Sequence, residues 1–366
     1  MARSQLRCGI VGLPNVGKST LFNALTAQQA PASNYPFCTI DPNVGIVERV
    51  DPRLQTLAQL SSSEKIVYAT VSFVDIAGLV EGASKGEGLG NQFLAHIRET
   101  DAILHLVRCF EESDVVHVAG RVDPLNDIEV INLELILADL QMVHKSLAKW
   151  EKQAKNQREL QPKVELLRRV AAHLDAGQPL RTLEISEEEK ELLSWQTFLS
   201  GKKVLYVANV GEEDLPSMEN PYVEQVRRHA EKEGSSLVAI CAKVEEEIAQ
   251  LPAAEQPEFL SSLGLAESGL QRIIHTAFDL LGLITYLTTG EMETRAWTIP
   301  KGSTAVEAAG VIHSDIQEGF IRAETVAYED LVAFGSRVAA REAGKVRAEG
   351  RSYLVRDGDV ILFLHH

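Results

Sequence analysis

Residues 12–19 have the residue types and the spacing of a phosphate-binding loop, G-x-x-x-x-G-K-[ST]. In this pattern successive backbone N–H groups converge on phosphate oxygens, the lysine reaches the outer phosphates, and the hydroxyl binds a magnesium ion. The loop follows an apolar run, residues 8–11, and precedes a helical stretch, which is the context that the pattern needs. The sequence therefore predicts a nucleoside triphosphate site that includes Asn15, Val16, Gly17, Lys18, Ser19 and Thr20.

A second motif, D-x-x-G at residues 75–78, lies at the end of another apolar run. A carboxylate at the end of a strand can hold a magnesium-bound water, and the glycine lets its N–H approach the γ-phosphate. The stretch Phe37-Cys38-Thr39, between the two motifs, offers a hydroxyl to the same ion. Together the motifs predict Ser19, Thr39 and Asp75 as metal-binding residues, and Lys18 and Gly78 as catalytic residues.

Short apolar runs alternate with helical stretches on both sides of a central insertion, as in a parallel sheet covered by helices. We therefore expect an α/β P-loop domain with a mostly parallel sheet, formed by residues 1–127 and 198–282. The expected strands are Leu6–Val11, Ala69–Val74, Ala102–Cys109, Lys203–Asn209 and Ser236–Cys241.

Residues 128–197 have the pattern of a helical insertion. Leu133, Leu140 and Leu147 recur every seven residues, which predicts a long helix with one apolar stripe. A polar stretch before Pro162 predicts a reversal, so we expect an antiparallel coiled-coil hairpin with a basic cluster, within residues 142–170, towards its tip. Ser186 and Glu189 form a capping box that starts a further short helix.

The pattern changes to strands and turns in residues 283–366, which predicts a small separate α+β domain. An Asp-Gly-Asp turn at residues 357–359 suggests a hairpin between strands Arg351–Val355 and Val360–Leu364. Six bases against two acids make residues 337–356 a second local basic patch, which we place on loops and edges.

The formal net charge of −16 argues against indiscriminate coating of nucleic acid, so any RNA contact must be local, and we expect no DNA partner. No apolar run is long enough to span a bilayer, and the first strand begins too early to leave room for a signal peptide. We therefore expect a cytoplasmic monomer without a membrane partner. The four cysteines, which form no C-x-x-C pair, suit buried, reduced thiols.

These motifs resemble those of the Obg-related GTPases, and the resemblance to the adenine-preferring YchF, or Obg-like ATPase, family runs end to end. It is carried by Tyr35–Asn43, Asp75–Asn91, Asp127–Asn132 and Arg295–Pro300 as well as by the phosphate loop. The resemblance implies a slow, Mg²⁺-dependent ATPase that binds GTP more weakly. It also implies a TGS (ubiquitin-like β-grasp) domain at residues 283–366 and a ribosomal partner, the large subunit in particular, contacted through the basic patches.

Guanine-specific relatives read their base with N-K-x-D, whereas this chain has Asn209-Val210-Gly211-Glu212. The lysine stem is lost, and the longer carboxylate no longer fits the two donors of guanine at the same distance. We expect Asn209, Val210 and Glu212 to contact the base together with Cys241 and Ala242. Recognition of guanine by Glu212 after a small shift stays open as an alternative.

Leu79 stands where Ras-type enzymes have a glutamine that orients water, which predicts slow intrinsic hydrolysis. The resemblance suggests His117 as a substitute catalytic residue, although the sequence alone describes an ordinary loop histidine. It also matches Asn15 to an asparagine that lets related enzymes bind K⁺ beside the phosphates.

Three functions remain open from the sequence. The first is an ATP-driven switch that hydrolyses ATP and changes its contact with the ribosome. The second is a ribosome- or RNA-binding module in which nucleotide is a structural ligand and hydrolysis is incidental, and the third is a GTP-driven switch. A small-molecule kinase would need a basic lid and an acceptor pocket, and we recognise neither in the sequence.

Overall fold

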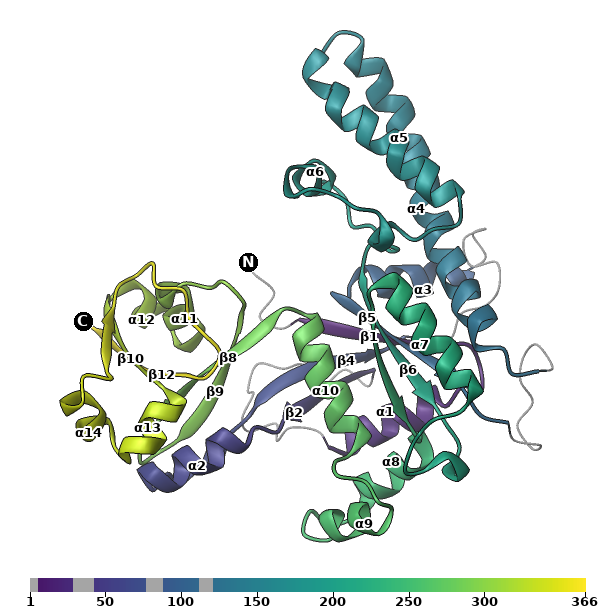
Figure 1. The fold of residues 1–366 in the computed structure, drawn as a ribbon. Helices are drawn as coiled ribbons and strands as arrows, with labels where there is room; N and C mark the ends of the chain where they lie inside the picture. The colour runs from purple at the N-terminus through teal and green to yellow at the C-terminus, as the bar shows by residue number, and fades with distance from the viewer. Residues whose placement is uncertain (1–5, 29–42, 77–87, 112–120) are drawn as a thin grey trace. The chain divides into compact units, whose positions relative to one another are not determined.

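The computed structural model describes residues 6–28, 43–76, 88–111 and 121–366. The chain divides into two compact units (Figure 1). The first comprises residues 1–28, 40–45 and 72–277, and the second comprises residues 29–39, 46–71 and 278–366.

A six-stranded sheet in the order β2-β4-β1-β5-β6-β7 lies mainly in the first unit, although most of β2 and the first residues of β4 fall within residues 46–71 of the second. Every pairing among its last five strands is parallel. Parallel strands are buried on both faces, and β5 and β6 accordingly consist almost wholly of buried residues. The expected α/β fold with a mostly parallel sheet is thus confirmed. The strands are β1 (Arg7–Val11), β2 (Val44–Arg49), β4 (Ala69–Asp75), β5 (Ala102–Arg108), β6 (Lys203–Asn209) and β7 (Ser236–Ile240).

Helices cover this sheet because each carries an apolar stripe (Figure 1). Apolar residues of α3, α4 and α7 form one continuous core with residues of the strands. The helices of the nucleotide-binding part are α1 (Lys18–Ala27), α3 (Gly88–Arg98), α7 (Pro221–Glu233), α8 (Ala242–Gln250), α9 (Gln256–Ser262) and α10 (Gly269–Leu280).

The insertion is a helical hairpin made of α4 (Pro124–Ala154) and α5 (Gln161–Asp175), which lie side by side in Figure 1. Ile136 and Val143 are buried against α5, but Leu133 is 50% exposed, so the expected apolar stripe joins the hairpin core only from Ile136 onward. The chain returns through η4 (Leu180–Thr182) and α6 (Glu187–Leu193). The predicted capping box of α6 is present in both of its hydrogen bonds.

A buried ion pair links η4, which follows the hairpin, to α7. Arg181 Nη2 lies 2.6 Å from Glu233 Oε1, and the two side chains are only 6% and 4% exposed. Arg181 also donates to Asn132 Oδ1 on α4, and the hydroxyl of Tyr206 on β6 donates to Glu233 Oε2. Burial raises the pKa of Glu233, but the charge of Arg181 and these hydrogen bonds outweigh burial and lower it overall.

His105 of β5 lies in the same interior and is 2% exposed. Its ring lies beside that of Tyr206, with the centroids 5.6 Å apart, and Nε2 has no hydrogen-bond partner among the described residues. Burial, followed by the charges of Arg181 and His229, lowers the pKa of His105 to about 3. This histidine is therefore neutral at physiological pH.

The second unit contains another six-stranded sheet, in the order β11-β10-β12-β8-β9-β3. Its strands are β3 (Ile66–Val67), β8 (Leu283–Thr289), β9 (Thr294–Pro300), β10 (Phe320–Ala327), β11 (Arg347–Glu349) and β12 (Asp359–His365). Its helices are α2 (Pro52–Ser61), α11 (Ala305–Ile312), α12 (Ser314–Glu318), α13 (Tyr328–Phe334) and α14 (Arg337–Glu342).

The predicted hairpin around residues 357–359 is wrong. Residues 351–355 form no strand, and β12 pairs instead with β10, antiparallel, and with β8, parallel. Asp357 does not act as a hairpin residue, because its carboxylate accepts from the Thr285 N–H at 2.9 Å and from Arg53 Nη1 at 2.9 Å. The turn therefore ties the start of β12 to β8 and α2.

Residues 46–71 belong to the second unit, whereas the sequence analysis placed them in the nucleotide-binding domain. β3 extends the sheet by pairing with β9, with Ile66 opposite Thr294. Ser63 Oγ donates to the carbonyl of Gly290 at 2.6 Å, and Arg53 bridges Asp51 and Asp357. The edge of β9 offers open backbone groups, which β3 satisfies.

Candidate nucleotide-binding site

The phosphate loop connects β1 to α1 through two residues in the left-handed region. Asn15 has φ 63° and Gly17 has φ 95°. Only glycine fits at position 17, because a Cβ there would lie 2.4 Å from Nδ2 of Asn209. The turn exposes Asn15 and Ser19 and buries Val16, and it presents the N-terminus of α1 to any bound anion.

Asn209, at the end of β6, joins the phosphate loop to the loop before α8. Its Nδ2 donates to the carbonyl of Val16 at 2.9 Å, and its Oδ1 accepts from the N–H of Ala242 at 2.9 Å. The residue is 4% exposed, so both bonds are protected from water. Sequence reasoning proposed Asn209 as a base contact and missed this positioning role, which requires knowledge of how three loops meet.

Lys18 and Asp75, predicted from separate motifs, meet in the structure. Their Nζ and Oδ1 atoms lie 2.5 Å apart, with side chains 14% and 24% exposed. The parallel pairing of β1 with β4 sets Asp75 opposite Ile10, just before the phosphate loop. The phosphate-binding cation and the metal-binding carboxylate thus belong to one local site.

The donor set suits magnesium. Asp75 supplies one carboxylate beside the loop, and Ser19 supplies an exposed hydroxyl at the start of α1. Magnesium is commonly held by one or two such protein ligands together with phosphate oxygens and water. The described residues contain no group of three or more His, Cys, Asp or Glu side chains that could hold a metal ion.

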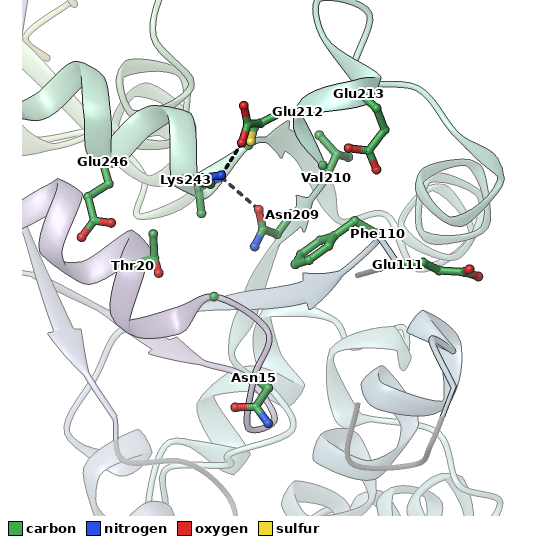
Figure 2. A pocket seen from close by; sticks show the side chains of 14 residues that line it. Asn15, Thr20, Phe110, Glu111, Asn209, Val210, Glu212, Glu213, Lys243 and Glu246 are labelled. Atoms are coloured by element: carbon green, nitrogen blue, oxygen red, sulfur yellow. Dashed lines mark hydrogen bonds and ion pairs between the residues drawn. The ribbon is translucent and has the colours of Figure 1, made fainter. Parts of the chain in front are cut away.

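A cavity of about 390 Å³ extends from the phosphate loop to the loops after β6 and β7 (Figure 2). Glu212 and Lys243 lie next to each other at the end of the cavity away from Asn15, with Oε1 and Nζ 2.5 Å apart. Of the predicted residues, Asn15, Gly17, Thr20, Asn209, Val210, Glu212, Cys241 and Ala242 line it. The sequence analysis missed Phe110, Glu111, Glu213 and Glu246, although the position of Phe110 just after a parallel strand was a usable signal.

The described cysteines are buried, as expected. Burial raises the pKa of the Cys8 thiol to about 12, and it also raises the pKa of Cys109 and of Cys241, which lines the cavity. These thiols are protonated at neutral pH and pack as small apolar groups. Cys38, Thr39, Gly78, Leu79 and His117 lie outside the described residues.

The basic cluster of the hairpin divides into paired and open parts. Arg168 pairs with Glu151 at 2.7 Å and Arg169 pairs with Glu189 at 2.8 Å, while Lys163 Nζ lies 3.7 Å from the ring centroid of Trp150. By contrast Lys145, Lys149 and Lys152 are exposed on α4 with a spacing of four and three residues, which places them on one helical face. We call these three residues the lysine stripe.

The C-terminal basic patch is largely neutralised. Arg337 is half-buried and donates to the carbonyl of Glu324, and Arg341 pairs with the carboxylate of the same residue at 2.5 Å. Lys345 and Arg347 lie 3.4 Å from Asp330 and Asp359. The patch is therefore a weaker anion surface than the sequence suggested.

Within the ranges that the structure describes, no helix combines the length and the apolar character needed to cross a bilayer.

Comparisons with known proteins agree on one family. Residues 7–210 match the family model described as "50S ribosome-binding GTPase", and residues 283–366 match the YchF-GTPase_C model, described as "Protein of unknown function (DUF933)". The chain is 52% identical over 360 residues to the "Ribosome-binding ATPase YchF" of Bacillus subtilis, covering 98% of both chains. It is equally identical over 359 residues to the Escherichia coli O157:H7 protein of the same name, again covering 98% of both.

A solved structure extends the likeness to three dimensions. It is titled "Structure of the Schizosaccharomyces pombe YchF GTPase" and superposes with a TM-score of 0.89 at 35% identity, covering 100% of this chain and 99% of that one.

Proposed function

The chain belongs to the YchF family, and on this basis we propose that it is a ribosome-binding ATPase that uses ATP in preference to GTP as a switch. The observation that carries the proposal is the cavity that begins at the phosphate loop and ends at the Glu212–Lys243 pair. Two 52%-identical relatives are named ribosome-binding ATPases, whereas the solved structure is titled a GTPase, so base preference is the point to test.

Each residue of the site has a proposed role. Backbone N–H groups of the loop and the N-terminus of α1 bind the phosphates, and Lys18 exchanges its contact with Asp75 for the β- and γ-phosphates. Ser19, Thr39 and Asp75 would hold Mg²⁺, which would supply positive charge against the charge that develops on the transferred phosphoryl group. Gly78, whose N–H would approach the γ-phosphate, and His117 are the further catalytic residues of this proposal. Asn15 provides a site for K⁺ beside the phosphates.

The lysine stripe supports a ribosomal contact, on the large subunit in our proposal. Three exposed ammonium groups on one helical face suit contact with RNA phosphates, whereas Arg168 and Arg169 of α5 are already paired with carboxylates. We extend the family assignment to a coiled-coil insertion at residues 128–197, a TGS domain at residues 283–366, and a monomer in the cytoplasm.

Calorimetry on nucleotide-free protein with Mg²⁺ tests base preference, and phosphate release with and without ribosomes and K⁺ tests the switch. Tighter ATP binding with turnover stimulated by ribosomes supports the proposal. Tighter GTP binding overturns the ATP preference. Turnover that ribosomes do not change would leave a binding module that nucleotide merely stabilises.

Ribosome co-sedimentation tests the surface. Changing Lys145, Lys149 and Lys152 together to Glu is expected to reduce co-sedimentation at least tenfold while ATP binding stays unchanged. The matched control reverses Arg341 and Lys345 in the C-terminal patch. If the control loses ribosome binding and the stripe variant retains it, the contact belongs to the C-terminal domain.

A further inference from the structure

Lys243 lines the cavity and forms an ion pair with Glu212. Among the described residues that line the cavity it is the one cation, alongside Glu111, Glu212, Glu213 and Glu246. We propose that Lys243 is a specificity-determining residue, which positions Glu212 so that the site disfavours guanine and accepts adenine. This inference rests on the proposed preference for ATP and assigns a cause to it.

Guanine needs two acceptors on its Watson–Crick edge, because both its ring N1–H and its amino group donate. A carboxylate satisfies both donors only when each of its oxygens is available. Oε1 of Glu212 lies 2.5 Å from Nζ of Lys243, so this oxygen is turned towards an ammonium group. This oxygen keeps a second lone pair, but a guanine donor that reached it would lie close to the ammonium charge, and this repulsion costs affinity.

Adenine presents one amino donor beside one ring acceptor. The Lys243–Glu212 pair offers the complementary pattern, with one carboxylate oxygen to accept and one ammonium to donate. Adenine therefore binds without breaking the pair.

The neighbouring loop supports the same preference through its backbone. The N–H of Ala242 donates to Oδ1 of Asn209 at 2.9 Å and is therefore already used. This N–H is therefore not available to a base acceptor such as the O6 atom of guanine. Because Asn209 is buried and also holds the carbonyl of Val16, releasing the N–H of Ala242 would disturb the phosphate loop.

The strength of the effect follows from exposure. The side chains of Lys243 and Glu212 are 68% and 53% exposed, and solvent-exposed pairs of this kind contribute at most about 1 kcal/mol, a factor of about five in affinity. We therefore expect Lys243→Met to move the ratio of Kd(GTP) to Kd(ATP) about fivefold towards GTP. Lys243→Arg, which keeps the positive charge, should retain most of the wild-type ratio.

The experiment measures both dissociation constants by calorimetry with Mg²⁺ for the full-length wild type, Lys243→Met, Lys243→Arg, Glu212→Gln and the Glu212→Gln/Lys243→Met double variant. Lys203→Met, on the exposed start of β6, is the matched control. The shift caused by Lys243→Met should largely disappear in the Glu212→Gln background, because Lys243 acts through that carboxylate. A non-specific effect of the lost charge, or a loss of folding, would instead change Kd(ATP) and Kd(GTP) by the same factor.

A ratio that Lys243→Met changes by less than twofold overturns the inference, and so does an equal shift in the Glu212→Gln background. Wild-type protein that binds GTP more tightly than ATP overturns the proposed function, and the two failures are distinguishable. The effect of Lys243→Met is read as a change in the ratio, whichever nucleotide the wild type prefers.

Discussion

Replacing His105 by leucine should make the first unit less sensitive to acid. His105 is 2% exposed and its pKa falls from 6.5 to about 3 on folding. Between these values the unfolded chain binds a proton that the folded chain does not, so stability is fully present above pH 6.5 and is lost as pH falls towards 3. Between pH 6.5 and 5.0 this one histidine lowers the free energy of unfolding by about 2 kcal/mol, at about 1.4 kcal/mol for each pH unit.

The charges of two neighbouring side chains also act on His105. Arg181 and His229 disfavour its charged form, and the lowered pKa of His229 makes that residue act in the same direction. We therefore expect calorimetric unfolding at pH 7.5 and 5.0 to show a smaller acid effect in His105→Leu. On acidification its free energy of unfolding should fall by about 2 kcal/mol less than that of the wild type. His144→Leu, on an exposed position of α4, should keep the wild-type profile. Equal losses in the wild type and in His105→Leu would refute the reasoning.

Three further predictions concern other parts of the chain. Arg181→Met leaves Glu233 buried and unpaired, so it should destabilise the first unit by about 3–5 kcal/mol in thermal unfolding, and adding Glu233→Gln should recover part of the loss; no recovery would contradict the pairing. Gly17→Ala should weaken nucleotide binding at least tenfold in calorimetry without unfolding the protein, because its Cβ would meet Asn209; unchanged affinity would refute this. A fragment of residues 283–366 lacks α2 and β3, so its urea midpoint should rise when residues 46–71 are added as a separate peptide. Identical midpoints with and without the peptide would show that residues 46–71 do not stabilise this domain.

Local signals predicted the strands and the loop that form the described part of the cavity. The phosphate loop, Asp75 and the strands that end at Asn209 and Ile240 depend on short patterns, because glycine geometry and strand burial act over a few residues. The capping box at Ser186 is of the same kind. Each of these features could be predicted from the sequence because its physical cause lies within one helix, strand or loop.

Long-range pairings were not predictable in this way. β3 has only two residues, and nothing in Ile66 or Val67 indicates that they pair with β9. The turn at residues 357–359 looked like a hairpin because the partners of Asp357, namely Thr285 and Arg53, are distant in sequence. The Lys243–Glu212 pair likewise depends on how two loops from neighbouring strands meet.

The incorporation of residues 46–71 into the second unit has a consequence for synthesis of the chain. Arg53 and its partner Asp357 are 304 positions apart. At about 5–20 residues per second, Arg53 is made about 15–60 s before Asp357 exists. β3 has no strand to join until β9 has been made, whereas the first unit, whose last residue is 277, can already be complete by then. The second unit therefore closes only once β12 has been made, and Arg53 lacks its partner Asp357 until then.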